Sequence, residues 1–349
     1  MTHPTSRTGR EALASLVLAL SLVACDDGAA TDAGTPADAG GSTDAGGLDA
    51  GTPPPDAGPG DHDAGAPTDG GGVRDPLVGI GPVEMVQGGF MFLEGPRWRE
   101  ADGVLLFTDI PASTIRRLMP PSTFDVFRNP SGMANGLATL PDGRLLAAEH
   151  ENRRVSVTAN DGTVTDFAAR DAMGRRFNSP NDVAVRSDGN VYFTDPPYGL
   201  TGTREIPFNG VFRVDPSGTV SVVWMSSSMA QRPNGIVISP DEATLYVDDT
   251  NDAVVRAFDI ASDGSVSGER MFATGVTNAD GMAIDTAGNL FVSTANGVIV
   301  FDYLGSRWGR IAVPQQPANC GFGDADHRTL YITAQTGLYR VRMRIPGMI

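Results

Sequence analysis

Apolar and polar positions alternate along most of the chain after Pro76, in short stretches that tight turns separate. Each unit has a short apolar stretch, a turn with Asp or Gly, and a second stretch rich in β-branched and aromatic residues. A period of two combined with such turns predicts β-hairpins. The six turns centre on Asp102, Asp142, Asp188, Asp241, Ala287 and Asp326, at intervals of 40, 46, 53, 46 and 39 residues.

Further strand candidates lie between the hairpins, for example at residues 114–118, 154–157, 211–214 and 254–259. Four strands in about 40–50 residues is the size of a propeller blade. No long apolar stripe with the helical period of 3.6 interrupts the pattern. The sequence therefore predicts an all-β fold, a six-bladed β-propeller of four-stranded blades over residues 76–349. Another all-β array, such as a β-helix or two sandwiches, is the alternative.

The two ends of this repeat region predict how the ring closes. The last strand candidate, residues 338–345, has no hairpin after it, and residues 77–92 precede the first hairpin. We expect these two segments to pair in one blade, because such pairing removes the open sheet edges.

The N-terminus is typical of an export signal. Arg7 and Arg10 form a short basic region, and an apolar run over residues 12–24 is too short to span a bilayer comfortably. The run ends in Leu-Val-Ala followed by Cys25, which is typical of a bacterial lipoprotein cleavage site. We therefore expect a signal peptide over residues 1–24, a lipidated Cys25, and export to the bacterial cell envelope, in the periplasm or at the cell surface. A plain secretory signal is the alternative.

Residues 25–75 consist mostly of Asp, Ala, Gly, Pro and Thr, a composition that cannot bury enough apolar surface to fold and predicts a disordered tether. Its eleven Asp and one Arg account for ten of the sixteen net negative charges. The propeller region is thus only mildly acidic and carries no clustered basic residues of the kind that bind nucleic acid. We expect no nucleic-acid partner, membrane attachment only through Cys25, and a monomer.

One oxygen-bearing side chain stands at the same register in every repeat, seven or eight residues before the turn. The first strand of a propeller blade lines the central channel, so residues at its start converge near the axis. We expect a ring of six polar side chains at one mouth of the channel. The six are Glu94, Asn135, Asn181, Asn234, Asp280 and Asn319.

The composition of this ring favours one kind of chemistry. Two carboxylates and four amides, with no His or Cys, form a hard oxygen site that suits Ca²⁺ or a similar divalent ion. Glu94 and Asp280 would offset its charge. Glycine follows four of the six residues and would let the backbones approach closely at the axis. Since Asn-Gly and Asp-Gly are ordinary turn dipeptides, a purely structural or water-filled channel is the alternative.

Several phrases of this sequence resemble the gluconolactonase family, which includes animal regucalcin (senescence marker protein). The resemblance covers most of residues 82–341. It is carried by residues 93–98, 178–182, 193–199, 232–235, 280–282 and 319–323. The phrase Asp-Pro-Pro-Tyr-Gly at 195–199 is similar to the bacterial gluconolactonase branch. The resemblance implies a six-bladed propeller, one catalytic divalent metal and hydrolysis of a sugar lactone to the aldonic acid.

The resemblance also implies site residues. Glu94, Asn234 and Asp280 correspond to metal ligands, and Asn181 to a further ligand or a substrate contact. Ca²⁺ is the expected ion, with Zn²⁺, Mn²⁺ or Mg²⁺ as alternatives. The animal members have a substrate-contacting arginine where this chain has Ser179, so the substrate pocket differs here.

For the reaction we expect the metal to polarise the lactone carbonyl and a water molecule to attack it. Asp280 is the expected general base, and Glu94 the second candidate for a catalytic role. Asn135 and Asn319 are expected to contact the sugar hydroxyls. Cys320, beside the ring, is expected to be a small buried side chain and not a nucleophile.

The ends of the second strands should return to the same mouth of the channel. This places Asp109, His150, Asp195 and Asp249 in a possible second ring, and His150 and Asp195 are candidate substrate contacts. A loop role is the alternative for both. Two other functions stay open: a non-catalytic surface propeller that binds sugars or proteins, and a hydrolase of other lactones, esters or phosphotriesters.

Overall fold

The computed structural model describes residues 75–349, and β-strands are the only regular elements in this range. The predicted signal peptide (1–24), the lipidated Cys25 and the tether up to residue 74 lie outside the described residues. Within residues 75–349, no helix has the length and hydropathy needed to cross a membrane.

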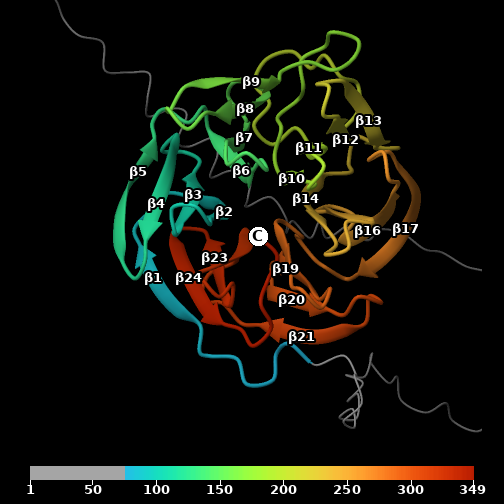
Figure 1. Ribbon diagram of the computed structural model, residues 1–349. Helices are drawn as coiled ribbons and strands as arrows, with labels where there is room; N and C mark the ends of the chain where they lie inside the picture. Colours follow the sequence, from blue (N-terminus) through green and yellow to red (C-terminus); the bar gives the residue numbers. More distant parts are fainter. Residues whose placement is uncertain (1–74) are drawn as a thin grey trace, which may run out of the picture. The chain divides into compact units, whose positions relative to one another are not determined.

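Twenty-four strands of residues 75–349 form six antiparallel sheets of four strands, which confirms the predicted six-bladed propeller. In five blades the strands follow chain order from the axis outward (Figure 1). The first blade consists of β2 (Leu93–Arg99), β3 (Val104–Asp109), β4 (Thr114–Met119) and β5 (Thr123–Arg128). The second consists of β6 (Ala134–Thr139), β7 (Leu145–Glu149), β8 (Arg154–Thr158) and β9 (Val164–Ala168). The third consists of β10 (Val183–Val185), β11 (Val191–Asp195), β12 (Gly210–Val214) and β13 (Val220–Met225). The fourth consists of β14 (Pro233–Ile238), β15 (Thr244–Asp249), β16 (Val254–Ile260) and β17 (Val266–Thr274). The fifth consists of β18 (Met282–Ile284), β19 (Leu290–Thr294), β20 (Gly297–Phe301) and β21 (Arg307–Ile311).

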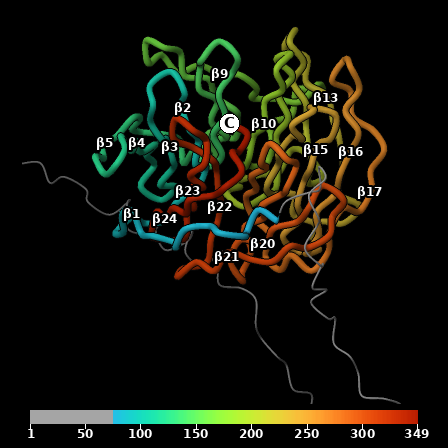
Figure 2. The backbone as a smooth tube through the Cα atoms, turned by 60° about the horizontal axis from the view of Figure 1, so that its bottom comes forward, coloured from blue at the N-terminus to red at the C-terminus, as the bar shows by residue number. Residues whose placement is uncertain are grey.

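The sixth blade joins the two ends of the propeller region. It contains β22 (Asn319–Gly323), β23 (Thr329–Ala334), β24 (Gly337–Arg342) and, as its outermost strand, β1 (Glu84–Gly88). Strand β1 runs antiparallel to β24 (Figure 2). The predicted closure is thus confirmed, although the last strand ends at Arg342 and not at residue 345.

The innermost strands contact one another around the axis, from β2 through β6, β10, β14 and β18 to β22 and back to β2. After β24 the chain turns inward, and its end lies near the centre of the ring (Figure 1). There the backbone N–H of Met348 donates to the carbonyl of Ile284 at 2.9 Å. The axis is therefore surrounded by six short strands that hold one another in place.

The hydrophobic core lies between neighbouring blades. Phe177, Phe193 and Phe212 are fully buried, with ring centroids 4.9–5.5 Å apart, in a cluster that also includes Leu146 of the preceding blade. Phe291 meets Phe322 of the next blade edge to face at 5.3 Å. Because apolar packing joins each blade to its neighbours, the strands that carry the site are held rigidly.

Candidate functional site

All six ring residues lie on or just before the innermost strand of their blade. Glu94 and Asn135 are the second residues of β2 and β6, Asn234 is the second of β14, and Asn319 is the first of β22. Asn181 and Asp280 precede β10 and β18 by two residues. Five of the six are buried, and Asp280 is partly exposed. The common register thus places six polar side chains around the axis.

Glycines allow the inner strands to approach this closely. Gly95 has φ of +45°, and a β-carbon there would lie 2.2 Å from the carbonyl oxygen of Asn135. A β-carbon on Gly281 would lie 1.9 Å from the Asn319 side chain. Both positions therefore need glycine for the ring to close around its polar side chains.

A chain of amide hydrogen bonds runs along half of the ring. Asn135 Nδ2 donates to Asn181 Oδ1 at 2.6 Å, and Asn181 Nδ2 donates to Asn234 Oδ1. Asn234 Nδ2 then donates to Thr250 Oγ1 at 3.0 Å, and Thr250 donates to the carbonyl of Ala279 at 2.7 Å. The chain thus ends on the residue before Asp280.

His150 lies against this amide chain. Its Nε2 is 3.1 Å from Asn181 Oδ1, and because an amide oxygen only accepts, Nε2 carries the hydrogen. Burial lowers the pKa of His150 to about 4, so its imidazole is neutral at neutral pH. A β-carbon on Gly199 would lie 2.4 Å from His150 Cβ, which means that the loop after β11 packs directly on this histidine.

The other half of the ring holds the two carboxylates. Burial raises the pKa of Glu94 to about 7, helped by the charge of Asp182 and opposed by hydrogen bonds from Gly95, Asn319 and Asp280. Burial, the charge of Glu94 and the charge of Asp248 hold the pKa of Asp280 well above its ordinary value. Glu94 and Asp280 thus lie close enough for their negative charges to repel each other.

Asp182 and Asp248 add two more acidic groups next to the ring, and the sequence analysis missed both. Asp248 is fully buried, and its Oδ2 has no hydrogen-bond partner. Burial raises the pKa of Asp182 to about 7. The signal for Asp182 was its place directly after Asn181. Asp248 precedes Asp249 at the end of β15, and the strand-end argument selected Asp249 in its place.

No Lys or Arg of residues 75–349 forms an ion pair with Glu94, Asp182, Asp248 or Asp280. Burying carboxylates without a counter-charge is costly, so the donor set fits a divalent cation. No three His, Cys, Asp or Glu side chains of this range converge as a metal cluster. Any ion in the ring would therefore depend on amide oxygens as well as on the carboxylates.

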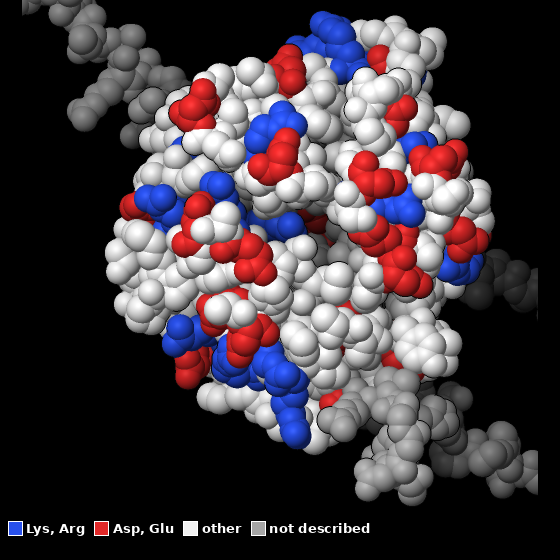
Figure 3. Space-filling model, viewed as in Figure 1, with Lys and Arg blue, Asp and Glu red and all other residues white. Residues whose placement is uncertain are grey.

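A cavity of about 170 Å³ lies along the axis below the ring. Its lining comes mainly from inner-strand residues that follow the ring members, together with Met348 and Ile349. Arg97 extends into it, and its Nε donates to Thr139 Oγ1 at 3.3 Å. Figure 3 shows that acidic and basic side chains are interspersed on the face in view.

The structure gives the three aspartates of the possible second ring a loop role, the stated alternative for Asp195. Asp195 is fully buried, and its two oxygens accept the backbone N–H groups of Asn178 and Ser179, both at 2.7 Å. Asp109 accepts those of Met91 and Phe92 in the same way. These carboxylates hold the chain that enters each inner strand, so Asp195 positions the segment before Asn181 and does not present its oxygens to a substrate.

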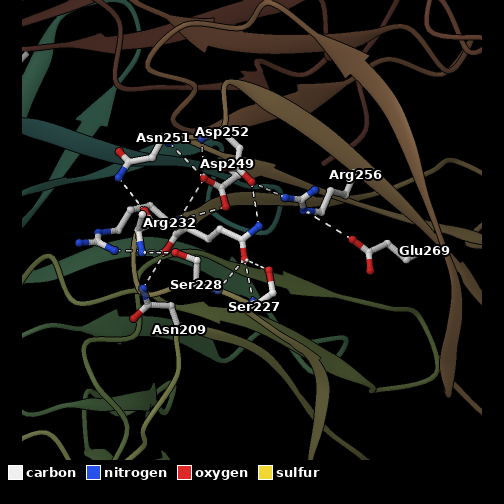
Figure 4. A network of polar contacts seen from close by, with 11 residues as sticks. Asn209, Ser227, Ser228, Arg232, Asp249, Asn251, Asp252, Arg256 and Glu269 are labelled. Carbon is white, nitrogen blue, oxygen red and sulfur yellow. Dashed lines mark hydrogen bonds and ion pairs between the residues drawn. The ribbon is translucent and has the colours of Figure 1, made fainter.

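Asp249 has the same role in the fourth blade. It accepts backbone N–H groups of Arg232, Asn251 and Asp252 at 3.0–3.1 Å (Figure 4). Around it, side chains of the neighbouring loops and strands form a polar network, in which Arg256 of β16 binds Asp252 at 2.6 Å. Of the four predicted members, only His150 reaches the amide ring.

Two further predicted positions have clear surroundings. Ser179 Oγ accepts the backbone N–H of Gly199 at 2.9 Å, so this position holds the loop after β11 in place. Cys320 is buried, and burial raises the pKa of its thiol to about 12. A thiol with that pKa is protonated at neutral pH, as expected for a small buried side chain and not for a nucleophile.

Fold and site together define a six-bladed propeller with an axial ring of oxygen-bearing side chains. Residues 92–336 match the family model of the SMP-30/gluconolactonase/LRE-like region. The chain belongs to this family.

The chain is 35% identical to a gluconolactonase of Zymomonas mobilis over 301 residues, which cover 76% of this chain and 82% of that protein. It is 28% identical to a pentonolactonase of Haloferax volcanii over 254 residues, 70% of this chain and 81% of that protein. Among solved structures, a gluconolactonase of Xanthomonas campestris superposes with a TM-score of 0.71 at 31% identity. The superposition covers 77% of this chain and 91% of that one.

Proposed function

We propose that this protein is a divalent-metal-dependent lactonase that hydrolyses a sugar lactone to the aldonic acid. The observation that carries the proposal is the pair of neighbouring carboxylates, buried Glu94 and partly exposed Asp280, in a ring that is otherwise built of amides. The two similar proteins named for lactonase activity, from Zymomonas mobilis and Haloferax volcanii, support the reaction class.

Glu94, Asn234 and Asp280 would hold the ion. All their donor atoms are oxygens, which favours Ca²⁺ and also permits Mg²⁺ or Mn²⁺. The unpartnered Oδ2 of Asp248 and the nearby Asp182 add negative charge that a cation would balance. When bound, the ion would supply Lewis acidity for the lactone carbonyl.

The side chains of the ring divide the remaining work. Asp280 is the ring residue that is partly exposed, which lets it take a proton from a water molecule as that water attacks the carbonyl carbon. The ring C–O bond of the lactone then breaks, and the leaving oxygen takes a proton to become the hydroxyl of the acid.

The amide side of the ring is the proposed substrate side. Asn135, Asn181 and His150 lie next to one another and carry N–H groups suited to sugar oxygens. Asn319 directs its Oδ1 to the backbone N–H of Cys320 at 2.8 Å and hydrogen-bonds Glu94 with its amide. We therefore assign Asn319 to holding Glu94 and the other three to contacting substrate.

The test is hydrolysis of D-glucono-1,5-lactone by purified protein that has been stripped with a chelator and then given Ca²⁺, Mn²⁺, Mg²⁺ or Zn²⁺. We expect metal-dependent turnover above the spontaneous rate, and its loss in Asp280→Ala. Tight metal binding without turnover would refute this substrate and turn the search to other lactones, esters or a non-catalytic ligand. Absence of both would refute the proposal.

Export remains part of the proposal. The lipoprotein-like sequence around Cys25 supports attachment to the cell envelope, where an exported lactonase would meet lactones formed outside the cytoplasm.

A further inference from the structure

Thr250, which directly follows β15, lies at the meeting point of the two halves of the ring. Its hydroxyl is within hydrogen-bond distance of Asn234 Nδ2 at 3.0 Å, of the Tyr198 hydroxyl at 2.7 Å and of the Ala279 carbonyl at 2.7 Å. A hydroxyl has one hydrogen to donate and two lone pairs that accept. All the hydrogen-bonding capacity of Thr250 is therefore in use.

The directions of these three bonds follow from their chemistry. The Ala279 carbonyl only accepts, so the single Thr250 hydrogen must go to it. Thr250 must then accept from both other groups, and the Asn234 atom that faces it must be the NH₂ group. These partners fix the orientation of the Asn234 amide. It leaves Oδ1 of Asn234 on the side of Asn181.

The same hydroxyl also ties the second half of the ring. Ala279 is the residue before Asp280, and its carbonyl is held by Thr250. Tyr198 lies in the loop after β11. The residue after it, Gly199, packs on His150, and its backbone N–H donates to Ser179 Oγ. One loop thus contacts the substrate side through Gly199 and the metal side through Tyr198.

We propose that Thr250, supported by Tyr198, is a positioning residue of the metal site. It selects the Asn234 orientation whose Oδ1 can serve as a ligand, and it anchors the backbone next to Asp280. The inference rests on the proposed function, because it assigns these residues to the ion that function requires. This assignment also gives the Asp-Pro-Pro-Tyr-Gly motif at 195–199 a physical role, since the hydroxyl of Tyr198 is the second donor to Thr250.

The experiment is calorimetric titration of Ca²⁺ into the chelator-stripped full chain. Thr250→Val keeps the shape of the side chain but cannot bond, and we expect a ten- to hundredfold weaker Kd, the range for partners that orient metal ligands. Thr250→Ser keeps the hydroxyl, and we expect its Kd within about threefold of wild type because all three bonds can form. Tyr198→Phe removes one donor, and we expect a smaller loss, of about three- to tenfold.

Tyr192→Phe is the matched control. Tyr192 is a buried tyrosine whose hydroxyl donates to the Gly264 carbonyl at 2.7 Å, so it loses one buried hydrogen bond elsewhere in the propeller. The Tyr192→Phe variant should bind Ca²⁺ with the Kd of wild type. Thermal melting in chelator shows whether each variant is folded. If Thr250→Val does not fold, the Ser and Phe variants decide.

The outcomes separate the two claims. Wild-type affinity in folded Thr250→Val, or in Tyr198→Phe when the valine variant does not fold, would overturn the positioning role and leave the metal site standing. Weak binding in Thr250→Ser equal to that in Thr250→Val would also overturn it, because the hydroxyl would then not be the active feature. A wild-type chain that binds no divalent ion would overturn both this inference and the proposed function.

Discussion

Without a bound ion, the propeller should lose stability as the pH rises through neutrality. In the metal-free ring, burial raises the pKa of Glu94 from 4.5 to about 7. Between these values the folded state binds a proton that the unfolded state has already released. Stability therefore falls as pH rises from about 4.5 to 7, the opposite of the usual behaviour of a carboxylate held by a basic partner.

The size of the effect follows from the shift. One pKa unit corresponds to about 1.4 kcal/mol, so the shift of Glu94 alone is worth about 3 kcal/mol. A domain of this size changes its Tm by roughly 2–4 °C per kcal/mol. We expect the Tm of chelated protein to fall by roughly 6–12 °C between pH 5 and pH 8 through this group.

The assay is differential scanning calorimetry at pH 5, 6, 7 and 8, with chelator and with excess Ca²⁺. Ca²⁺ should reverse the slope, because protons compete with the metal for the same carboxylates and lose as pH rises. Glu94→Gln in chelator should flatten the pH dependence and raise the Tm at pH 8 above that of wild type. Glu84→Gln, an exposed glutamate on β1, is the matched control and should leave the slope unchanged.

The comparison of wild type with Glu94→Gln isolates Glu94 from the other groups that titrate in this range. A chelated wild-type Tm that rises from pH 5 to pH 8 relative to Glu94→Gln would refute the reasoning. Equal slopes in the two proteins would refute it as well, since Glu94 would then have an ordinary pKa in the fold.

Four further predictions follow from the site, the ring closure and the N-terminus. Asp280→Ala should lower kcat for lactone hydrolysis by at least about a hundredfold while the circular dichroism spectrum is unchanged; near-normal turnover would reject its proposed role. Gly281→Ala should displace Asn319, since the new β-carbon would lie 1.9 Å from it, and calorimetry should show weaker Ca²⁺ binding. Deletion of residues 338–349 removes the strand between β1 and β23 and should abolish cooperative melting, whereas a folded, soluble truncation would argue against closure by β24. Cys25→Ser should abolish incorporation of labelled fatty acid and release the protein from membranes, and persistent labelling would exclude Cys25 as the acceptor.

The sequence was informative about the fold because each blade repeats the same local signals. Six hairpin turns with regular spacing predicted six sheets, and the unpaired end segments predicted the pairing of β1 with β24. The end of β24 was misplaced by three residues. Met343 and Ile345 are apolar on either side of Arg344, as in a strand, but β24 ends at Arg342 and Met343 packs in the core of the last two blades. Apolar patterning alone does not show where a strand ends.

The ring was also predictable, because its six members share one register on six equivalent strands. The residues that support the ring were not. Asp195 and Asp249 end their strands as ring candidates would, but their oxygens turn back to backbone N–H groups of their own blade. Thr250 contacts Asn234 and Ala279 from the end of a second strand. Such contacts depend on side-chain direction at strand ends, which no periodicity in the sequence encodes.

The direction of the amide chain separates the ring into two chemical sides. From Asn135 to Asn234, every amide passes a hydrogen toward the next, and the chain ends on the Ala279 carbonyl. The carboxylates lie beyond that end, with Asn319 hydrogen-bonded to Glu94. Asn234 belongs to both sides, since it accepts from Asn181 and also hydrogen-bonds Asp280. A change of its orientation would therefore disturb the proposed ligands and the proposed substrate contacts together, which is why a fully bonded hydroxyl at Thr250 matters more here than one hydrogen bond on the surface of a blade would.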